Sequence, residues 1–262
     1  MTDLDRIAHL LDTAARTAES VPQVSLETPF TLDEAYDIQH RVVQLRVDRQ
    51  DVVTGVKLGF TNPAKAAQMG LSDVIVGQIT SDMAVADGGI LDRERFIHVR
   101  AEPELAFRLG VNVNPADPRS SVYDAVDAVA PAIEFIDSRY RNFKFTLEDV
   151  VADNTSASAY TVGQWVPFGP RAPHLDISNC GVTLELDGHV VESGSTAAIL
   201  GNPLRALDAT KRMAAAYGFA LPAGTIILAG AATIATAVGE HTTVTARVSK
   251  LGTVSARFSG GE

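Results

Sequence analysis

The sequence predicts an α+β fold, in which a helical N-terminal segment lies on a mixed, strongly curved β-structure with few covering helices. Apolar residues recur at helical spacing within residues 1–50, whereas short β-prone runs alternate with glycine-containing turns from residue 52 onward. The strands and helices do not alternate strictly, as they do in a doubly wound parallel sheet. No repeat or linker-like tract divides the chain, so we expect residues 1–262 to form one domain with 1–50 as its helical segment.

Two helices are expected in the N-terminal segment. The first is capped by Thr2, ends before Pro22, and carries an apolar stripe of Leu4, Ile7, Leu11 and Ala14. The second begins with the capping-box pair Thr31 and Glu34, which precedes Ala35, Ile38, Val42 and Leu45 at helical spacing. Each helix therefore has one face to bury.

The remainder of the chain is mostly β-prone. Strand patterns cover 52–60, 74–79, 96–109, 132–136, 159–166, 181–192, 225–228 and 242–258. The pair Asp187-Gly188 predicts a hairpin turn between two alternating runs. Helical patterns are confined to 63–69, 121–129, 146–151 and 203–217, the last of them closed by Gly218.

Composition excludes several classes of protein. The chain has 22 Lys and Arg against 32 Asp and Glu, a formal net charge of −10, and no basic cluster. This balance argues against nucleic acid or an anionic membrane as a partner. The only cysteine, Cys180, permits no internal disulfide, and the acidic start of the chain does not resemble an export signal, so we expect a cytoplasmic protein.

One uncharged stretch, 221–238, approaches the length of a membrane-spanning helix. It contains Pro222, Gly224 and Gly230, and most of its other residues are small, so we interpret it as a short buried strand leading into a small-residue loop. Motifs for nucleotide binding, zinc peptidases and serine hydrolases are absent from the sequence, and the six histidines lack metal-ligand spacing.

Three glutamates form the candidate metal site. Glu102 and Glu104 are two residues apart in a β-prone run, so both side chains project from the same face. Glu134 is the one charged residue in the apolar run 130–136. Carboxylate oxygens suit Mg²⁺ or Mn²⁺ better than zinc. The alternative is that the first two are exposed edge charges and that Glu134 pairs with Arg100 or Arg139.

Lys57 is the second unusual charge, because it lies in the strand pattern 52–60 among apolar residues. A buried cation is costly unless it faces acidic groups or a substrate anion. Its default alternative is a surface-facing lysine. Because three acidic residues are available as partners, the second interpretation is that Lys57 has an electrostatic role in the candidate metal site.

Several segments together carry a resemblance to a known family. They are GVKLGFT (55–61), EPE (102–104), PAIEFIDSRY (131–140), VADNTSAS (151–158) and LGTVSARF (251–258). In this order they resemble the 2-keto-4-pentenoate hydratase / 4-oxalocrotonate decarboxylase family, within the fumarylacetoacetate-hydrolase-like superfold. The resemblance implies a mixed β-roll with helices outside it.

The resemblance also implies roles for individual residues. Glu102, Glu104 and Glu134 match the ligands of a divalent metal, Mg²⁺ or Mn²⁺, and Lys57 matches the active-site lysine. Asn154 and Ser156 match residues that line the substrate pocket. Asp82 and Asp153 are weighed as proton-transfer residues against turn capping. The loop 229–237 is our candidate for an apolar wall near the leaving carboxylate.

Segments 69–83, 138–158 and 229–238 resemble the decarboxylase branch. The implied lyase reaction is metal-dependent decarboxylation of 4-oxalocrotonate (2-oxohex-3-enedioate) to 2-oxopent-4-enoate and CO₂, in meta-cleavage aromatic catabolism. The same-family alternative is hydration of 2-hydroxypenta-2,4-dienoate to 4-hydroxy-2-oxopentanoate, and a distant alternative is a non-catalytic acidic binding domain. The resemblance further implies a homo-oligomer and a complex with the pathway hydratase.

Overall fold

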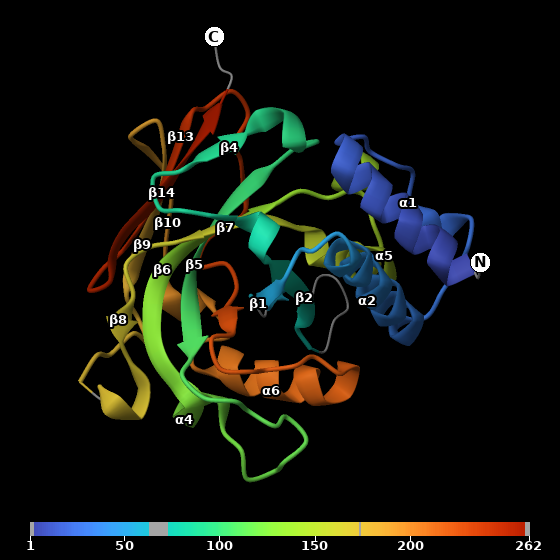
Figure 1. Ribbon diagram of the computed structural model, residues 1–262. Coiled ribbons are helices and arrows are strands. Elements are labelled where there is room, and N and C mark those ends of the chain that lie inside the picture. Colours follow the sequence, from blue (N-terminus) through green and yellow to red (C-terminus); the bar gives the residue numbers. More distant parts are fainter. Residues whose placement is uncertain (1–2, 63–72, 173, 260–262) are drawn as a thin grey trace.

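Two β-sheets form the body of the molecule (Figure 1). The computed structural model describes residues 3–62, 73–172 and 174–259. Within these ranges the larger sheet has the spatial order β2 (Ile75–Thr80), β1 (Val53–Gly59), β11 (Ile226–Leu228), β5 (Arg100–Leu109), β6 (Val126–Ile136), β7 (Ala157–Val162) and β3 (Ala84–Val85), with β12 (Thr236–Ala237) beside β5 and β8 (Val166–Pro167) beside β6. The smaller sheet has the order β10 (His189–Ser195), β9 (Gly181–Leu186), β13 (Thr243–Val248), β14 (Gly252–Ser259) and β4 (Ile90–Asp92).

The sheets are mixed, as the sequence predicts. Strand β1 pairs in parallel with β11 and antiparallel with β2, and β5 pairs antiparallel with both β11 and β6. Figure 1 shows the larger sheet curling, with helices outside it. The α+β fold with a curved β-structure and a helical N-terminus is therefore confirmed.

The helices occupy the positions expected from capping signals. In the described part of the chain the two longest are α1 (Asp3–Thr17) and α2 (Leu32–Asp48), and the others are α4 (Val122–Ala125), α5 (Leu147–Ala152) and α6 (Arg205–Tyr217). The capping box of α2 is complete, because the Thr31 side chain accepts from the Glu34 N–H and the Glu34 carboxylate accepts from the Thr31 N–H at 2.7 Å. Gly218 ends α6 in the left-handed region, at φ +77°.

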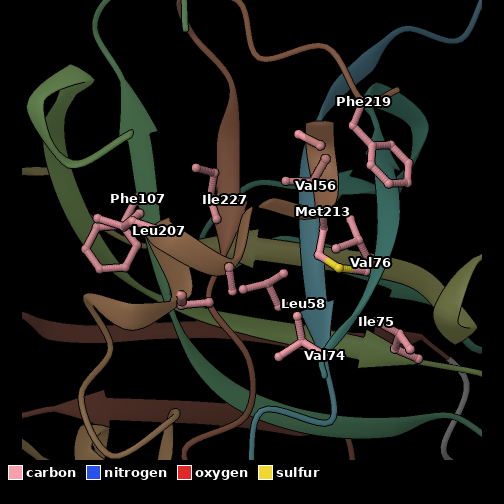
Figure 2. Close-up of a cluster of buried hydrophobic side chains, with 14 of the residues drawn as sticks. Val56, Leu58, Val74, Ile75, Val76, Phe107, Leu207, Met213, Phe219 and Ile227 are labelled. Atoms are coloured by element: carbon pink, nitrogen blue, oxygen red, sulfur yellow. The ribbon is translucent and has the colours of Figure 1, made fainter. Parts of the chain in front are cut away.

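The largest hydrophobic cluster joins the helices to the outer face of the larger sheet. Figure 2 shows Met213 of α6 beside Val56 of β1 and Val76 of β2, and Leu207 of α6 beside Phe107 of β5. Buried residues of the N-terminal helices, Ile7, Leu11, Ala35 and Ile38, belong to the same cluster. The N-terminal segment thus shares a core with the sheet.

Side-chain alternation separates the two faces of the larger sheet. A second cluster packs the sheets together and includes Ala101 and Phe135 of the larger sheet with Leu184, Val244 and Phe258 of the smaller. A third cluster on the inner face contains Ala106 and Ala132 together with Ile79, Met83, Tyr160 and Leu228. Ala106 and Ala132 lie on the same strand faces as the polar residues described below, and their small side chains leave room for them.

Some boundaries differ from the sequence prediction. The helical pattern at 121–129 yields only α4, and β6 begins at Val126, because pairing with β5 extends the strand through Leu109↔Val126. The helix expected at 63–69 lies outside the described residues. The hairpin at Asp187-Gly188 is confirmed, with both residues at positive φ. None of the described helices is long and apolar enough to span a bilayer.

Candidate active site

Three glutamates converge on the inner face of the larger sheet. Glu102 and Glu104 project from β5, and Glu134 of β6 is the direct cross-strand partner of Glu102. One carboxylate oxygen from each residue lies within 4.8 Å of the others. The i, i+2 spacing on one strand and the register with the next therefore bring together the three acids that the sequence singled out.

The donor set fits a hard divalent cation. Glu104 is 1% exposed and Glu102 is half-buried, so the two are not exposed edge charges, and Glu134 is also 1% exposed. Within the described residues, Glu104 Oε1 and Glu134 Oε2 are buried and accept no hydrogen bond, and Glu134 Oε1 pairs with the Lys57 ammonium group. Buried carboxylates with unused lone pairs are costly unless a cation binds them, and oxygen ligands suit Mg²⁺.

The carboxyl groups also raise one another's pKa. Burial raises the pKa of Glu104 well above its ordinary value, and the negative charges of Glu134 and Glu102 raise it further. Burial likewise raises the pKa of Glu134, to about 7, although the Lys57 cation offsets part of this effect. The cluster thus favours binding of a positive charge.

Lys57 projects from β1 toward the same cluster. Its Nζ lies 3.0 Å from Glu134 Oε1 in an ion pair and donates a hydrogen bond to the Thr155 carbonyl at 2.9 Å. Lys57 is 2% exposed, so the surface-facing alternative is wrong. Glu134 pairs with Lys57 rather than with Arg139, whose ion-pair partner is Asp153.

The Thr155 carbonyl is presented by a strained turn, η5 (Asn154–Ser156). All three residues have positive φ, at 48°, 56° and 56°. Non-glycine residues in this region each cost about 1–2 kcal/mol, so neighbouring contacts must hold the turn. The turn was not foreseen, because its sequence carries no glycine.

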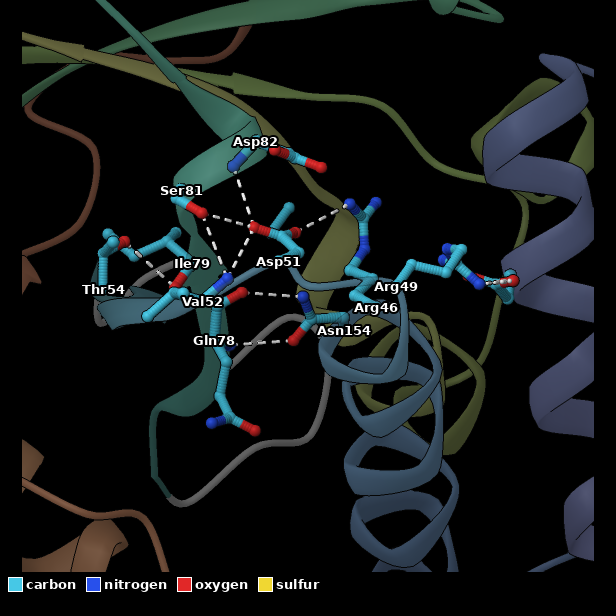
Figure 3. Close-up of polar contacts among 12 residues, drawn as sticks. Arg46, Arg49, Asp51, Val52, Thr54, Gln78, Ile79, Ser81, Asp82 and Asn154 are labelled. Atoms are coloured by element: carbon cyan, nitrogen blue, oxygen red, sulfur yellow. Dashed lines mark hydrogen bonds and ion pairs between the residues drawn. The ribbon is translucent and has the colours of Figure 1, made fainter.

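Two sets of hydrogen bonds hold η5 in place. The Asn154 side chain accepts from the Gln78 N–H and donates to the Gln78 carbonyl, each at 2.8 Å (Figure 3). Asp153, which precedes the turn, forms a buried ion pair with Arg139 and accepts from the Arg139 N–H at 3.0 Å. These contacts fix the turn against β2 and against the segment that follows β6.

Glycines permit the close approach of η5 to the sheet. A Cβ on Gly77 would lie 2.6 Å from the Asn154 carbonyl oxygen, and one on Gly59 would lie 2.8 Å from Thr155 Cγ2. A third close approach occurs at Gly230, whose N–H donates to Glu104 Oε2 at 2.8 Å. Gly230 has φ +104°, and a Cβ there would lie 2.2 Å from Thr61 Oγ1.

A cavity of about 280 Å³ opens beside this cluster. Its polar lining includes Lys57, Glu102, Arg100, Thr155 and Ser156. The Thr155 and Ser156 hydroxyl oxygens are buried without a hydrogen-bond partner among the described residues. Its apolar lining includes Ile75, Ile136, Phe143, Phe145 and Val150. The cavity therefore has one polar side and one apolar side.

The structure places the remaining predicted residues as follows. Asn154 does not line the cavity, because its amide is bonded to Gln78. Asp82 and Asp153 do not line it either; Asp153 is buried against Arg139. The loop 229–237 contributes Ala231 and Thr233 to the lining, while the aromatic wall comes from residues that the sequence analysis did not select.

The family follows from comparison with known proteins. The model for the fumarylacetoacetate (FAA) hydrolase C-terminal region matches residues 50–259. The chain therefore belongs to the fumarylacetoacetate hydrolase family, as the motifs predicted.

Within that family, two groups of relatives match most of the chain. It is 46% identical over 261 residues to a 4-oxalocrotonate decarboxylase from Pseudomonas sp., covering 98% of each chain. It is 32% identical to a 2-keto-4-pentenoate hydratase from Paraburkholderia xenovorans, covering 89% of this chain and 86% of the hydratase. The structure of 4-oxalocrotonate decarboxylase from Pseudomonas putida G7 complexed with magnesium and adipate matches with a TM-score of 0.89 and 34% identity, covering 98% of each chain.

Proposed function

We propose that this chain is a metal-dependent lyase that decarboxylates 4-oxalocrotonate to 2-oxopent-4-enoate and CO₂, in the catabolism of aromatic compounds by meta-cleavage. The observation that carries the proposal is the convergence of Glu102, Glu104 and Glu134 beside Lys57 at a cavity, in a chain that matches decarboxylases along nearly its whole length. A non-catalytic binding domain would not need unsatisfied buried carboxylates.

Glu102, Glu104 and Glu134 are the residues that would hold Mg²⁺, or Mn²⁺. When bound, the metal supplies Lewis acidity to the keto oxygen of a 2-oxo acid. Glu134 has a second role, because its ion pair orients Lys57. Gly230 has a supporting role, since its N–H fixes one oxygen of Glu104 and leaves the other for a cation.

Lys57 acts as a fixed electrostatic stabiliser. When the C5–C6 bond of the substrate breaks, its electron pair moves through the conjugated chain toward the C2 oxygen, and C6 leaves as CO₂. A proton from water then adds to C3 and gives 2-oxopent-4-enoate. The Lys57 ammonium group stabilises the negative charge that develops at the C2 oxygen. Its contacts with Glu134 and the Thr155 carbonyl hold the ammonium in place before the reaction, so little reorganisation is needed.

The two sides of the cavity serve different parts of the substrate. The Thr155 and Ser156 hydroxyls, which lack partners among the described residues, hydrogen-bond the substrate. The apolar wall of Ile75, Phe145 and Val150 excludes water from the leaving carboxylate, and loss of CO₂ then relieves a poorly solvated charge. Asn154 is a positioning residue, because it holds η5 without lining the cavity.

The substrate and the reaction are tested together. The protein is incubated with 4-oxalocrotonate and, separately, with 2-hydroxypenta-2,4-dienoate. We expect CO₂ release from the first and little 4-hydroxy-2-oxopentanoate from the second. The reverse pattern would identify a hydratase. Hydration is the second candidate because the match to a hydratase covers 86% of the length of that hydratase. No product from either substrate would contradict both proposals.

We also propose that residues 1–262 form one catalytic domain in the cytoplasm, that the chain self-associates, and that it binds the hydratase of its pathway. The shared hydrophobic cluster of the N-terminal helices and the sheet supports the single domain. The free, buried Cys180 supports a reducing compartment.

Strand β10, at the edge of the smaller sheet, exposes Val190 and Val191, which supports association. Native mass spectrometry of the protein, alone and with the hydratase, tests both associations.

A further inference from the structure

Arg100 is a cation at the cavity to which the reaction above assigns no role. It begins β5 two residues before Glu102, so the two side chains project from the same face of the strand. The residues are separated by about 6.6 Å along the strand. Arg100 is half-buried and lines the cavity together with Glu102 and Lys57.

The guanidinium of Arg100 is held in place by an aromatic ring and has no acidic partner within the described part of the chain. Its Cζ lies 4.4 Å from the centre of the Phe143 ring, and the His98 ring packs against Phe143 at 4.5 Å. Phe143 has φ +54°, an uncommon conformation for this residue type. The Arg100 side chain forms no hydrogen bond or ion pair with any residue in the described ranges. The aromatic ring therefore orients a cation whose hydrogen-bond donors have no partner among residues 3–62, 73–172 and 174–259.

Charge counting indicates what this cation binds. Three carboxylates would be balanced by Lys57 and one bound divalent cation. Among the described lining residues, Arg100 is then the remaining positive charge. A substrate carboxylate is its complement, and the planar fork of an arginine matches a carboxylate.

The substrate has two carboxylates, and the chemistry separates them. A strong ion pair with the leaving C6 carboxylate would stabilise the ground state and oppose loss of CO₂. The C1 carboxylate is retained and adjoins the keto group that must lie near the glutamates. Arg100 and Glu102 project from the same face of β5 and both line the cavity, so the guanidinium is near the glutamates beside which the keto group and C1 must lie.

We propose that Arg100, oriented by Phe143, binds the C1 carboxylate of the 2-oxo acid and thereby directs the C6 carboxylate toward the apolar wall. This inference rests on the proposed function and names the residue that fixes substrate orientation. The contact with Phe143 then has a purpose, because a guanidinium that pointed toward the C6 carboxylate would bind it and oppose its loss as CO₂.

Two unreactive analogues test the assignment. 2-Oxopentanoate carries only the C1 carboxylate, whereas 2-oxoadipate carries both, and their affinities are measured in the presence of Mg²⁺ by competition with substrate and by calorimetry. Arg100→Met should weaken both analogues by a similar factor, roughly 10- to 100-fold, as expected for loss of a charge-assisted hydrogen-bonded pair. Loss of affinity for 2-oxoadipate alone would place Arg100 at C6 and overturn the inference, and so would unchanged affinity for both.

Control variants separate this effect from misfolding. Arg108 also lies on β5 with its guanidinium near an aromatic ring, Trp165 at 5.3 Å, but it pairs with Asp127 and does not line the cavity. Arg108→Met should leave both affinities unchanged. Arg100→Lys keeps the charge but loses the fork, so it should show a smaller loss than Arg100→Met. Equal loss in all three variants would contradict the inference.

Failure of this inference is distinguishable from failure of the proposed function. If wild-type protein releases CO₂ from 4-oxalocrotonate and Arg100→Met binds both analogues normally, only the role of Arg100 is wrong. If wild-type protein binds Mg²⁺ but neither analogue and releases no CO₂, the proposed function is wrong.

Discussion

Lys57 Nζ and Glu134 Oε1 lie 3.0 Å apart, and both side chains are almost fully buried. This ion pair links the lysine of β1 to the three-glutamate cluster of β5 and β6. Each partner offsets the cost of burying the other, so removal of either leaves an uncompensated charge. The same contact fixes the ammonium group at the edge of the cavity.

Replacing Lys57 by methionine should lower kcat by about 10²–10³-fold, because the developing negative charge loses a fixed stabiliser. Binding of one Mg²⁺ per chain should persist, since the glutamates remain. Steady-state kinetics and calorimetry measure the two effects. Lys211→Met is the control, because Lys211 bonds backbone carbonyls at Pro118 and Ser120 away from the cavity. A near-normal kcat in Lys57→Met would show that the lysine is not catalytic.

Replacing Glu134 by glutamine should weaken Mg²⁺ affinity, because a neutral amide is a poorer ligand than a carboxylate. Removal of a residue that only hydrogen-bonds a metal ligand typically lowers metal affinity by roughly 10–100-fold, so loss of a ligand should lower it by at least that factor. Calorimetric titration measures it. Glu185→Gln is the matched control, since Glu185 pairs with the exposed Arg247 on the smaller sheet. Equal Mg²⁺ affinity in the two variants would contradict the ligand assignment.

Gly230→Ala should destabilise the protein more than Gly224→Ala. Both glycines have positive φ, at +104° and +88°, so both substitutions incur about 1–2 kcal/mol of backbone strain. Only at Gly230 does the new Cβ collide with Thr61, which should add about 1–3 kcal/mol. Urea denaturation measures the difference. Equal midpoints for the two variants would show that the close approach at Gly230 is not required.

Asp153→Asn should cost about 3–5 kcal/mol of stability, because it leaves the buried Arg139 guanidinium without its counter-ion. The exposed pair Arg212 and Asp73 provides a comparison, and Asp73→Asn should cost less than about 1 kcal/mol. Chemical denaturation of both variants tests this ranking. A loss for Asp153→Asn no larger than that for Asp73→Asn would contradict a structural role for the buried pair.

Asn154 and Ser156 should respond differently to substitution by alanine. Asn154→Ala removes the two bonds to Gln78 and should lower stability and kcat with little change in KM, because the amide does not line the cavity. Ser156→Ala should raise KM, because its hydroxyl lines the cavity without a partner among the described residues. Kinetic constants for both variants decide the matter; a large KM effect from Asn154→Ala would indicate direct contact with substrate.

Local alternation is sufficient to place the glutamates on a common face. The spacing of Glu102 and Glu104 fixes their shared face, and the apolar neighbours of Glu134 indicate its burial. The register that sets Glu134 opposite Glu102 is not readable in this way, because it depends on how the two long strands pair. The helical pattern at 121–129 shows the same limit, since pairing with β5 overrides it from Val126 onward.

Other parts of the site have no local signal. The left-handed run Asn154–Ser156 contains no glycine, and it persists because Gln78, Arg139 and the glycines of β1 and β2 hold it from outside. The Thr155 carbonyl that receives the Lys57 hydrogen bond is a backbone group, which residue type cannot reveal. The stacking of Arg100 on Phe143 likewise joins two segments that are distant in sequence.

The central claim is that the three glutamates hold a metal on which decarboxylation depends. It is tested by measuring CO₂ release from 4-oxalocrotonate as Mg²⁺ is titrated into chelator-treated protein. We expect release to be absent at first and to rise to a plateau at one Mg²⁺ per chain, with no such plateau in Glu134→Gln at the same concentrations. Undiminished CO₂ release by the metal-free protein would contradict the account.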